Sequence, residues 1–379
     1  MIKKICSTIL LSCLIFMMLA SFSFAKEGSS LNIESKSAVL IEMNTGTVLY
    51  EHNKDLKLPP ASVTKIMTLL LVFEAIENGI ISYDQMITVS ENASSMGGSQ
   101  IFLEPGEQMS VNDLLKSVII ASANDAALTL AEEVGGSEEQ FVKMMNDKAS
   151  QLGMQNTSFE NVTGLDDTVS NHLTTAYDIA LMSRELLKHE KVTEYATIWM
   201  DTIRNGEFGL TNTNRLIRFY RGITGLKTGY TSGAGFCVSA SAKRDGMHLI
   251  AVVIGAETSQ KRNDTATKLL NYGFSNYGLY SDGEESFDSL TISGGSKESI
   301  CAKKNAYEAL VNKGELGKVT KEEIIFDNLE APIKNNEKVG EIIYKIDGKE
   351  IGRSDIIATE AVERLSLWEY ILKIIKNLL

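Results

Sequence analysis

The chain is organised around the stretch Pro59-Pro-Ala-Ser-Val-Thr-Lys-Ile-Met-Thr-Leu-Leu-Leu-Val-Phe73, which continues to Asn78-Gly79. From Ile66 to Phe73 the residues are apolar on almost every side and leave no polar face, which predicts a buried helix. The two prolines are typical of the start of a helix, and Asn78-Gly79 is typical of its end. The other elements are therefore expected to pack around this helix.

Ser62 and Lys65 lie three positions apart at the first turn of this helix, so both side chains project from one face. A lysine is rare in a buried helix, because a buried ammonium needs a partner or must lose its proton. A hydroxyl beside a lysine that can deprotonate is a nucleophile beside its base. The helix N-terminus adds a backbone N–H and a partial positive charge where an oxyanion could form. The alternative is a helix cap followed by a lysine that reaches the surface.

The N-terminal residues are predicted to be a secretory signal peptide over 1–25, and the protein is therefore expected to be exported. Lys3 and Lys4 precede an apolar run over 9–19, and Ser23-Phe-Ala25 places small residues at a cleavage site after Ala25. Cleavage would remove two positive charges and change the net charge from −12 to −14. So acidic an exported chain is a poor candidate for nucleic-acid binding.

The remaining cysteines, Cys237 and Cys301, could form a disulfide, but two buried free thiols are favoured in a chain long enough to build its own core. The cysteines and the four histidines show no zinc-binding spacing. No metal or cofactor is therefore expected.

The order of predicted elements indicates an α+β fold. Two short strands over 38–43 and 47–50 precede the central helix. Helices are then predicted over 111–120, 126–134, 141–152 and 175–187, with an irregular loop over 154–173. Strands return over 226–230, 236–242 and 247–255, before a helix over 265–277. This order predicts an antiparallel sheet with an edge strand from the N-terminal segment, helices packed against it and a mainly helical insert.

The composition changes near Leu279, which predicts a catalytic domain over 26–279 and a small all-β domain over 280–362. A hairpin is clear over 339–346 and 349–358. The tail, 363–379, has apolar residues at helical spacing and lysines opposite them. It is too short to span a bilayer, which takes about 20 residues. A helix lying on the membrane surface is favoured over one packed on the protein.

Two further motifs join Ser62-Val-Thr-Lys65. Ser122-Ala-Asn124 lies in a predicted turn between helices, and Lys227-Thr-Gly229 opens a predicted strand. Each motif alone is weak, but the three in this order and in these elements form a strong joint signal. With Asn161-Val-Thr-Gly-Leu165 and the C-terminal β domain, the sequence resembles the low-molecular-mass penicillin-binding proteins, specifically serine-type D-alanyl-D-alanine carboxypeptidases. The resemblance covers nearly the whole chain after the signal peptide.

The resemblance implies a β-lactamase/transpeptidase-like fold and a role for each motif in acyl transfer. Ser62 would attack the penultimate D-alanine of a peptidoglycan stem peptide, with Lys65 as base and Ser122 as proton relay. Asn124 would bind the substrate backbone. The oxyanion hole would be the backbone N–H groups of Ser62 and Tyr230. The substrate carboxylate would be held by Lys227, Thr228 and Arg262, and penicillins would acylate Ser62.

Some positions depart from the pattern of this family. Tyr230 follows Lys227-Thr-Gly229 where some relatives have histidine, and only its backbone is needed for the hole. A basic residue that some relatives place upstream appears here as Thr213, with Arg215 close by. Arg262 could equally be a surface arginine at the start of a helix. His172 resembles a family position, and a structural role is expected for it.

Two alternatives remain open from the sequence. A class A-like β-lactamase shares Ser-x-x-Lys and Lys-Thr-Gly, but the loop over 154–173 lacks the Glu-x-x-Leu-Asn pattern that activates the deacylating water. A wall-binding module with a vestigial serine site would not need three intact motifs.

Overall fold

The computed structural model describes residues 31–165 and 169–378. The predicted signal peptide lies outside the described residues. Leu31 and Asn32 form no regular structure, and the described residues from Ile33 onward form one compact unit.

A five-stranded antiparallel sheet holds the first part of the chain together. Its strand order is β2-β1-β9-β8-β7. The N-terminal pair therefore lies at one edge, as predicted, and β7 forms the other edge. The strands are β1 (Ser37–Glu42), β2 (Val48–His52), β7 (Ile223–Thr231), β8 (Gly235–Arg244) and β9 (Met247–Ala256).

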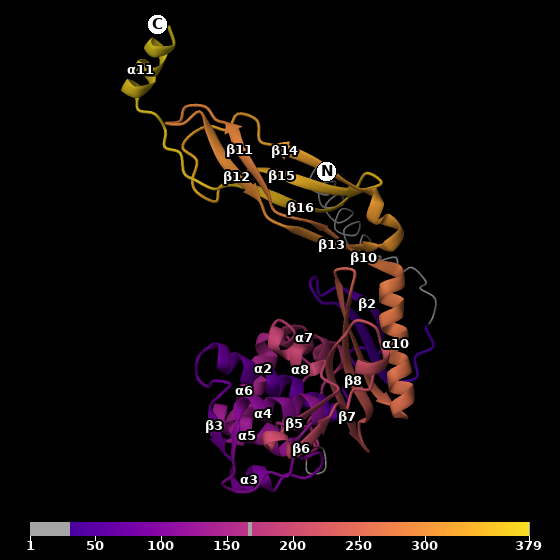
Figure 1. Ribbon diagram of the computed structural model, residues 1–379. Coiled ribbons are helices and arrows are strands. Elements are labelled where there is room, and N and C mark those ends of the chain that lie inside the picture. Colours follow the sequence, from indigo (N-terminus) through magenta and orange to yellow (C-terminus); the bar gives the residue numbers. More distant parts are fainter. Residues whose placement is uncertain (1–30, 166–168, 379) are drawn as a thin grey trace, which may run out of the picture. The chain divides into compact units, whose positions relative to one another are not determined.

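Helices cover both faces of this sheet (Figure 1). Helix α10 (Ser259–Asn276) lies on one face, where Gly273 packs against Leu40 and Leu249. The alternate residues Val39, Ile41 and Ile250 join the helical core on the other face. Because both faces are covered, the central strands β1, β8 and β9 are buried along most of their length instead of alternating between buried and exposed residues.

The predicted central helix is confirmed and is buried on nearly every side. A 3-10 turn, Ala61–Thr64, leads into α2, Lys65–Glu77, and every residue of α2 from Lys65 to Phe73 is buried. The helices around it are α3 (Glu91–Ser94), α4 (Val111–Lys116), α5 (Asn124–Gly135), α6 (Glu138–Gln151), α7 (Ala176–Leu186) and α8 (Glu190–Ala196).

Several boundaries differ from the predictions. Helix α10 begins six residues earlier than the predicted 265, because the Thr258 side chain caps it by accepting from the Lys261 N–H. The predicted helix over 111–120 changes to a π-helical turn at Ser117–Ala121. The sequence did not predict α9 (Leu216–Phe219) or the strand pairs β3 (Met86–Thr88) with β4 (Gln108–Ser110) and β5 (Met200–Ile203) with β6 (Phe208–Thr211).

The C-terminal part is built from strands around a separate cluster of buried residues that includes Ile300, Ile342 and Tyr344. Strands β10 (Tyr277–Asp282) and β13 (Tyr307–Asn312) pair with each other. A five-stranded sheet has the order β11-β12-β16-β15-β14, and its β15–β16 hairpin was predicted. Its strands are β11 (Glu285–Thr291), β12 (Ser299–Lys304), β14 (Val319–Ile325), β15 (Lys338–Ile346) and β16 (Lys349–Ala358).

The last element is the helix α11 (Leu367–Leu378). Leu367 and Trp368 are each 76% exposed, and Ile375 is 48% exposed, so these apolar side chains are not packed on the protein. No helix in the described residues is long and apolar enough to span a bilayer.

Both cysteines of the described chain are free thiols. Cys237 is buried as expected, but Cys301 is exposed on the C-terminal β part, so the prediction of two buried thiols was wrong for that residue.

Candidate active site

Ser62 and Lys65 lie where the 3-10 turn runs into α2. The Lys65 Nζ donates to the Ser62 Oγ at 3.0 Å and to the backbone carbonyl of Thr163 at 3.0 Å. The residue before the serine, Ala61, has a φ of +50°, a conformation that L residues rarely adopt and that clusters at functional sites.

The surroundings of Lys65 favour its neutral form. Its side chain is fully buried, and burial holds the pKa of this amine well below its usual value. The charge of Lys227 lowers the pKa of Lys65 further, and Asp125 acts in the opposite direction. A neutral amine in contact with a hydroxyl can accept its proton.

The second motif follows the π-helical turn. Ser122 has a φ of +65° and is buried, and Asn124 opens α5. The Asn124 side chain donates to the Gly97 carbonyl at 2.6 Å, and its backbone N–H donates to the Ser99 carbonyl at 2.7 Å. Its Oδ1 is buried and has no hydrogen-bond partner among the described residues. This oxygen is therefore available to accept from an incoming N–H group.

The third motif lies on β7, the edge strand of the sheet, and contacts the Ser62 turn. A Cβ built on Gly229 would lie 2.9 Å from the Ser62 backbone nitrogen and 3.1 Å from the Pro60 carbonyl. Only a glycine allows so close an approach of two backbones. Gly229 therefore brings the edge of β7 and the turn that carries Ser62 together.

The residues next to Gly229 on β7 carry the polar groups of the third motif. Lys227 is buried, and its Nζ donates to the carbonyl of Thr228 at 3.0 Å. Burial, and then the charge of Arg262, lower the pKa of Lys227 to about 7. The Thr228 hydroxyl donates to the Thr213 hydroxyl at 2.8 Å, and Tyr230 is exposed.

Arg262, in the first turn of α10, is buried and is not the surface arginine that the sequence left possible. It lies 6.0 Å from the centre of the Phe236 ring. Burial lowers the pKa of Arg262 to about 10, and the charge of Arg215 acts in the same direction. Three cations, Lys227, Arg262 and Arg215, therefore act on one another electrostatically at this edge of the sheet.

Sequence reasoning missed two groups that hold the site. Thr163 contributes only its backbone carbonyl, which has no residue signature. The buried Asp125 carboxylate accepts from the backbone N–H groups of Ile101, Leu103 and Ala126, and so fixes a loop beside Asn124. An acidic residue directly after Ser122-Ala-Asn124 was the signal that could have found it.

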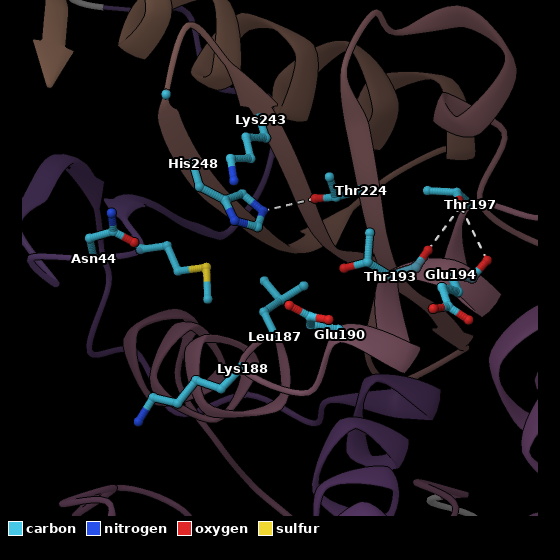
Figure 2. A pocket seen from close by; sticks show the side chains of 12 residues that line it. Asn44, Leu187, Lys188, Glu190, Thr193, Glu194, Thr197, Thr224, Lys243 and His248 are labelled. Carbon is cyan, nitrogen blue, oxygen red and sulfur yellow. Dashed lines mark hydrogen bonds between the residues drawn. The ribbon is translucent and has the colours of Figure 1, made fainter.

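Two cavities differ in their relation to these residues. One, of about 540 Å³, borders the site, since Gly97 and Thr163 both line it. The other, of about 750 Å³, is lined by Thr224, Lys243 and His248 and by none of the motif residues (Figure 2). There the Thr224 hydroxyl lies 2.9 Å from the His248 Nε2, and burial lowers the pKa of His248 to about 4. Neither cavity is lined by Ser62, Lys65 or Lys227, so neither one alone marks the substrate site.

No group of three or more His, Cys, Asp or Glu side chains in the described residues is arranged to hold a metal ion.

Family models match two parts of the chain. Residues 24–258 match the D-alanyl-D-alanine carboxypeptidase model (Peptidase S11), and residues 274–364 match the C-terminal domain of penicillin-binding protein 5.

Known proteins match over most of their length. The chain is 44% identical to the D-alanyl-D-alanine carboxypeptidase DacF of Bacillus subtilis, over 96% of this chain and 95% of that protein. It is 34% identical to DacC of Escherichia coli, over 90% and 88%. The structure of penicillin-binding protein 5 from Haemophilus influenzae superposes with a TM-score of 0.77 at 30% identity, covering 89% of this chain and 100% of that one. Ampicillin-bound penicillin-binding protein D2 from Listeria monocytogenes superposes with a TM-score of 0.60 at 34% identity, over 65% and 100%.

These matches agree with the three motifs and with the α+β fold predicted from the sequence, and they decide against a class A β-lactamase and a vestigial binding module. The chain belongs to the family of serine-type D-alanyl-D-alanine carboxypeptidases, the low-molecular-mass penicillin-binding proteins.

Proposed function

We propose that this chain removes the terminal D-alanine from peptidoglycan stem pentapeptides through an acyl-enzyme on Ser62. The supporting observation is the 3.0 Å contact between the Ser62 Oγ and a fully buried Lys65 amine. The serine oxygen bonds to the carbonyl carbon of the penultimate D-alanine, and its proton passes to Lys65. The C–N bond then breaks, and the departing D-alanine nitrogen takes up a proton. Water hydrolyses the resulting ester and restores Ser62.

Ser122 relays the proton to the leaving nitrogen, and Asn124 orients the substrate backbone. The unpaired Oδ1 of Asn124 supports this role, because a substrate N–H would satisfy a buried acceptor that has no protein partner.

The oxyanion is held by the backbone N–H groups of Ser62 and Tyr230. Support comes from Gly229, whose close approach to the Ser62 nitrogen brings the start of α2 beside the edge of β7. Two preorganised donors in a buried site stabilise the charge that develops on the carbonyl oxygen.

The substrate carboxylate is bound by Thr228, Arg262 and Lys227. The cations attract it, and the buried position of Arg262 makes the attraction stronger than it would be in water. Thr213 accepts from Thr228 at the place where some relatives have a basic residue, and the exposed Arg215 supplies a charge nearby.

Mass spectrometry after penicillin treatment tests this assignment. A single adduct is expected on the peptide that contains Ser62, together with slow release of the drug. Ser62→Ala should abolish both the adduct and the release of D-alanine from a pentapeptide ending in D-Ala-D-Ala. The matched control is Ser183→Ala, which removes another buried hydroxyl, bonded to Ser239 at 2.8 Å, and should keep both activities. An adduct elsewhere, or fast penicillin hydrolysis, would contradict the proposal.

We further propose that the protein is exported after cleavage at Ala25 and acts at the outer face of the cytoplasmic membrane, where it contributes to cell-wall biogenesis and cell shape. The domain limits are 26–279 for the peptidase, 280–362 for the β domain and 363–379 for the membrane helix. Two separate clusters of buried residues and the limits of the two family models support this division. The exposed apolar side chains of α11 support the membrane contact.

A further inference from the structure

The buried side chain of His172 joins two segments that are far apart in the sequence. Its Nε2 lies 2.8 Å from the Thr64 hydroxyl, and its Nδ1 accepts from the Glu160 backbone N–H at 3.0 Å. The ring also packs edge-on against Phe159, with ring centres 5.7 Å apart. His172 is 3% exposed and Thr64 is fully buried, so water does not compete for the bond between these two side chains.

The backbone partner decides the protonation state of the ring. The Glu160 N–H can only donate, so the His172 Nδ1 must be the unprotonated nitrogen. The proton of the neutral ring is therefore on Nε2, which donates to the Thr64 hydroxyl. If the ring were protonated, its Nδ1–H would face the Glu160 backbone N–H, and the hydrogen bond between His172 and Glu160 would be lost.

The two hydrogen bonds of His172 connect two segments that both adjoin Lys65. Thr64 lies between Ser62 and Lys65 in the 3-10 turn. Glu160 begins the segment that ends at Gly164, and the Thr163 carbonyl of that segment accepts from the Lys65 Nζ. The segment is itself a tight turn, because the Asn161 Oδ1 accepts from the N–H groups of Thr163 and Gly164.

We propose that His172 is a positioning residue for the acylation step. Its neutral ring fixes the spacing between the turn that carries Ser62 and Lys65 and the segment that carries the Thr163 carbonyl. It thereby aims the Lys65 amine at the Ser62 hydroxyl. His172 does not touch the substrate in this scheme, and the proposal rests on the roles proposed above for Ser62 and Lys65.

Two amide substitutions separate the ends of the bridge. In His172→Asn the side-chain oxygen takes the place of Nδ1 and can still accept from Glu160, but the link to Thr64 is lost. In His172→Gln the amide nitrogen reaches the place of Nε2 and keeps the link to Thr64. Thr64→Val removes the same link from the other side without changing the ring.

We expect His172→Asn and Thr64→Val to lower kcat for the pentapeptide, and the rate of penicillin acylation, by about 10- to 100-fold, the effect of a misplacement of about 1 Å. KM should change less than threefold, since no substrate contact is lost. His172→Gln should recover part of the loss. The double variant should be no slower than the slower single one, because both changes remove one link.

The proposal is wrong if folded His172→Asn and Thr64→Val acylate within about twofold of the wild type, or if their losses multiply in the double variant. Thr64→Val keeps the test valid should the His172 variants fail to fold. His248→Gln, a change of a histidine that lines the other cavity, is the control and should leave kcat unchanged. If Ser62→Ala loses the penicillin adduct as expected but the His172 variants are unaffected, only this inference is rejected. If Ser62→Ala is still labelled by penicillin, the proposed function itself is rejected.

Discussion

At the scale of single residues, the site contains two buried amines, Lys65 and Lys227, and the charge of Lys227 lowers the pKa of Lys65. Within the described residues, Lys65 and Lys227 donate to a hydroxyl and to backbone carbonyls, and not to a carboxylate. Protonating one raises the cost of protonating the other, which keeps one amine available as a base. Asp125 opposes this effect at Lys65, so the protonation of the base reflects three charges acting on one buried amine.

Removing the charge of Lys227 should shift the acidic side of the pH profile of the acylation rate to higher pH. Its ammonium lowers the pKa of Lys65, so Lys227→Gln should raise that pKa. A base with a higher pKa is protonated at higher pH, so the acylation rate should begin to fall at a higher pH than in the wild type. The measurement is the penicillin acylation rate from pH 5 to 9, each variant scaled to its own plateau. Lys243→Gln, an exposed lysine, should leave the profile in place, and an unshifted profile in Lys227→Gln would contradict the coupling.

The same lysine should make folding stability depend on pH. The pKa of Lys227 is about 7 in the folded protein and about 10.5 when unfolded, so the unfolded chain binds more protons between these values. The free energy of unfolding of the wild type should therefore rise with pH across this window. Lys227→Met should show a smaller rise, since only the contribution of the buried Lys65 remains, and should be more stable at pH 7 by about 1 to 2 kcal/mol, a common result when a functional buried charge is replaced. Denaturant unfolding at pH 7, 8 and 9 measures both effects, with Lys243→Met as control. Parallel pH profiles for Lys227→Met and the wild type would refute the expectation.

Single residues were predictable where a side chain carries the chemistry. Ser62, Lys65 and Lys227 have residue types and spacings that few other roles require. The burial of Arg262 could not be read from its neighbours, because α10 and the side of β8 meet only in the fold. Thr163 lies in the quoted motif Asn161-Val-Thr-Gly-Leu165, but its contact with Lys65 was not predicted, since any residue supplies a carbonyl. His172 was noted, but its two partners lie at separations of 108 and 12 residues, which no local pattern reveals.

At the scale of elements, the catalytic turn is held by two glycines from different parts of the chain. Gly229 brings β7 against it, and Gly164 packs from the other segment. A Cβ built on Gly164 would lie 1.8 Å from the Ala61 carbonyl oxygen and 2.6 Å from the Thr64 hydroxyl. The two elements that meet at Ser62 therefore have no room for side chains at these points.

Gly164→Ala should displace the segment from the turn. The methyl group meets backbone, and the φ of +85° is itself unfavourable for alanine. Strain of about 1 to 2 kcal/mol and overpacking of about 1 to 3 kcal/mol should together reduce the free energy of unfolding, and acylation should slow because the Thr163 carbonyl moves. Gly136→Ala is the matched control, with a φ of +77° and nothing within 4 Å, and should show the strain alone. Equal losses in the two variants, with normal acylation, would show that the close contact is not needed.

Elements with a strong apolar pattern were predicted well, and polar ones were not. The strands β8 and β9 and the hairpin β15–β16 are apolar runs bounded by turn residues, and their limits agree with the structure within two residues. The β5–β6 pair carries exposed Met200 and polar residues on short strands, so it lacks the alternation that signals a strand. The start of α10 was missed because its first turn is polar and is stabilised by the Thr258 cap instead of by an apolar face.

At the scale of the whole molecule, the helical part and the C-terminal β part of the described chain have separate clusters of buried residues. The clusters around Leu70 and around Tyr344 are each built from their own elements. Leu367, Trp368 and Ile375 of α11 are exposed, which is costly in water unless another surface covers them. The sequence pattern was sufficient to predict this helix, because its apolar and charged residues alternate at helical spacing.

Deleting residues 366–379 should release the protein from membranes and leave carboxypeptidase activity intact, since none of the residues assigned to catalysis lies in this segment.

A finer test places one charge on the exposed apolar side chains. Ile371→Glu and Ile375→Glu should each weaken binding to lipid vesicles by about 10- to 100-fold. This factor corresponds to about 1.5 to 3 kcal/mol for burying one aliphatic side chain. Glu369→Gln, a change of a charged residue of the same helix, should bind at least as well as the wild type. The assay is co-sedimentation with vesicles, with D-alanine release measured on the same samples. Membrane binding that survives the deletion would place the contact elsewhere in the chain, and a loss of activity on deletion would mean that the helix supports the fold.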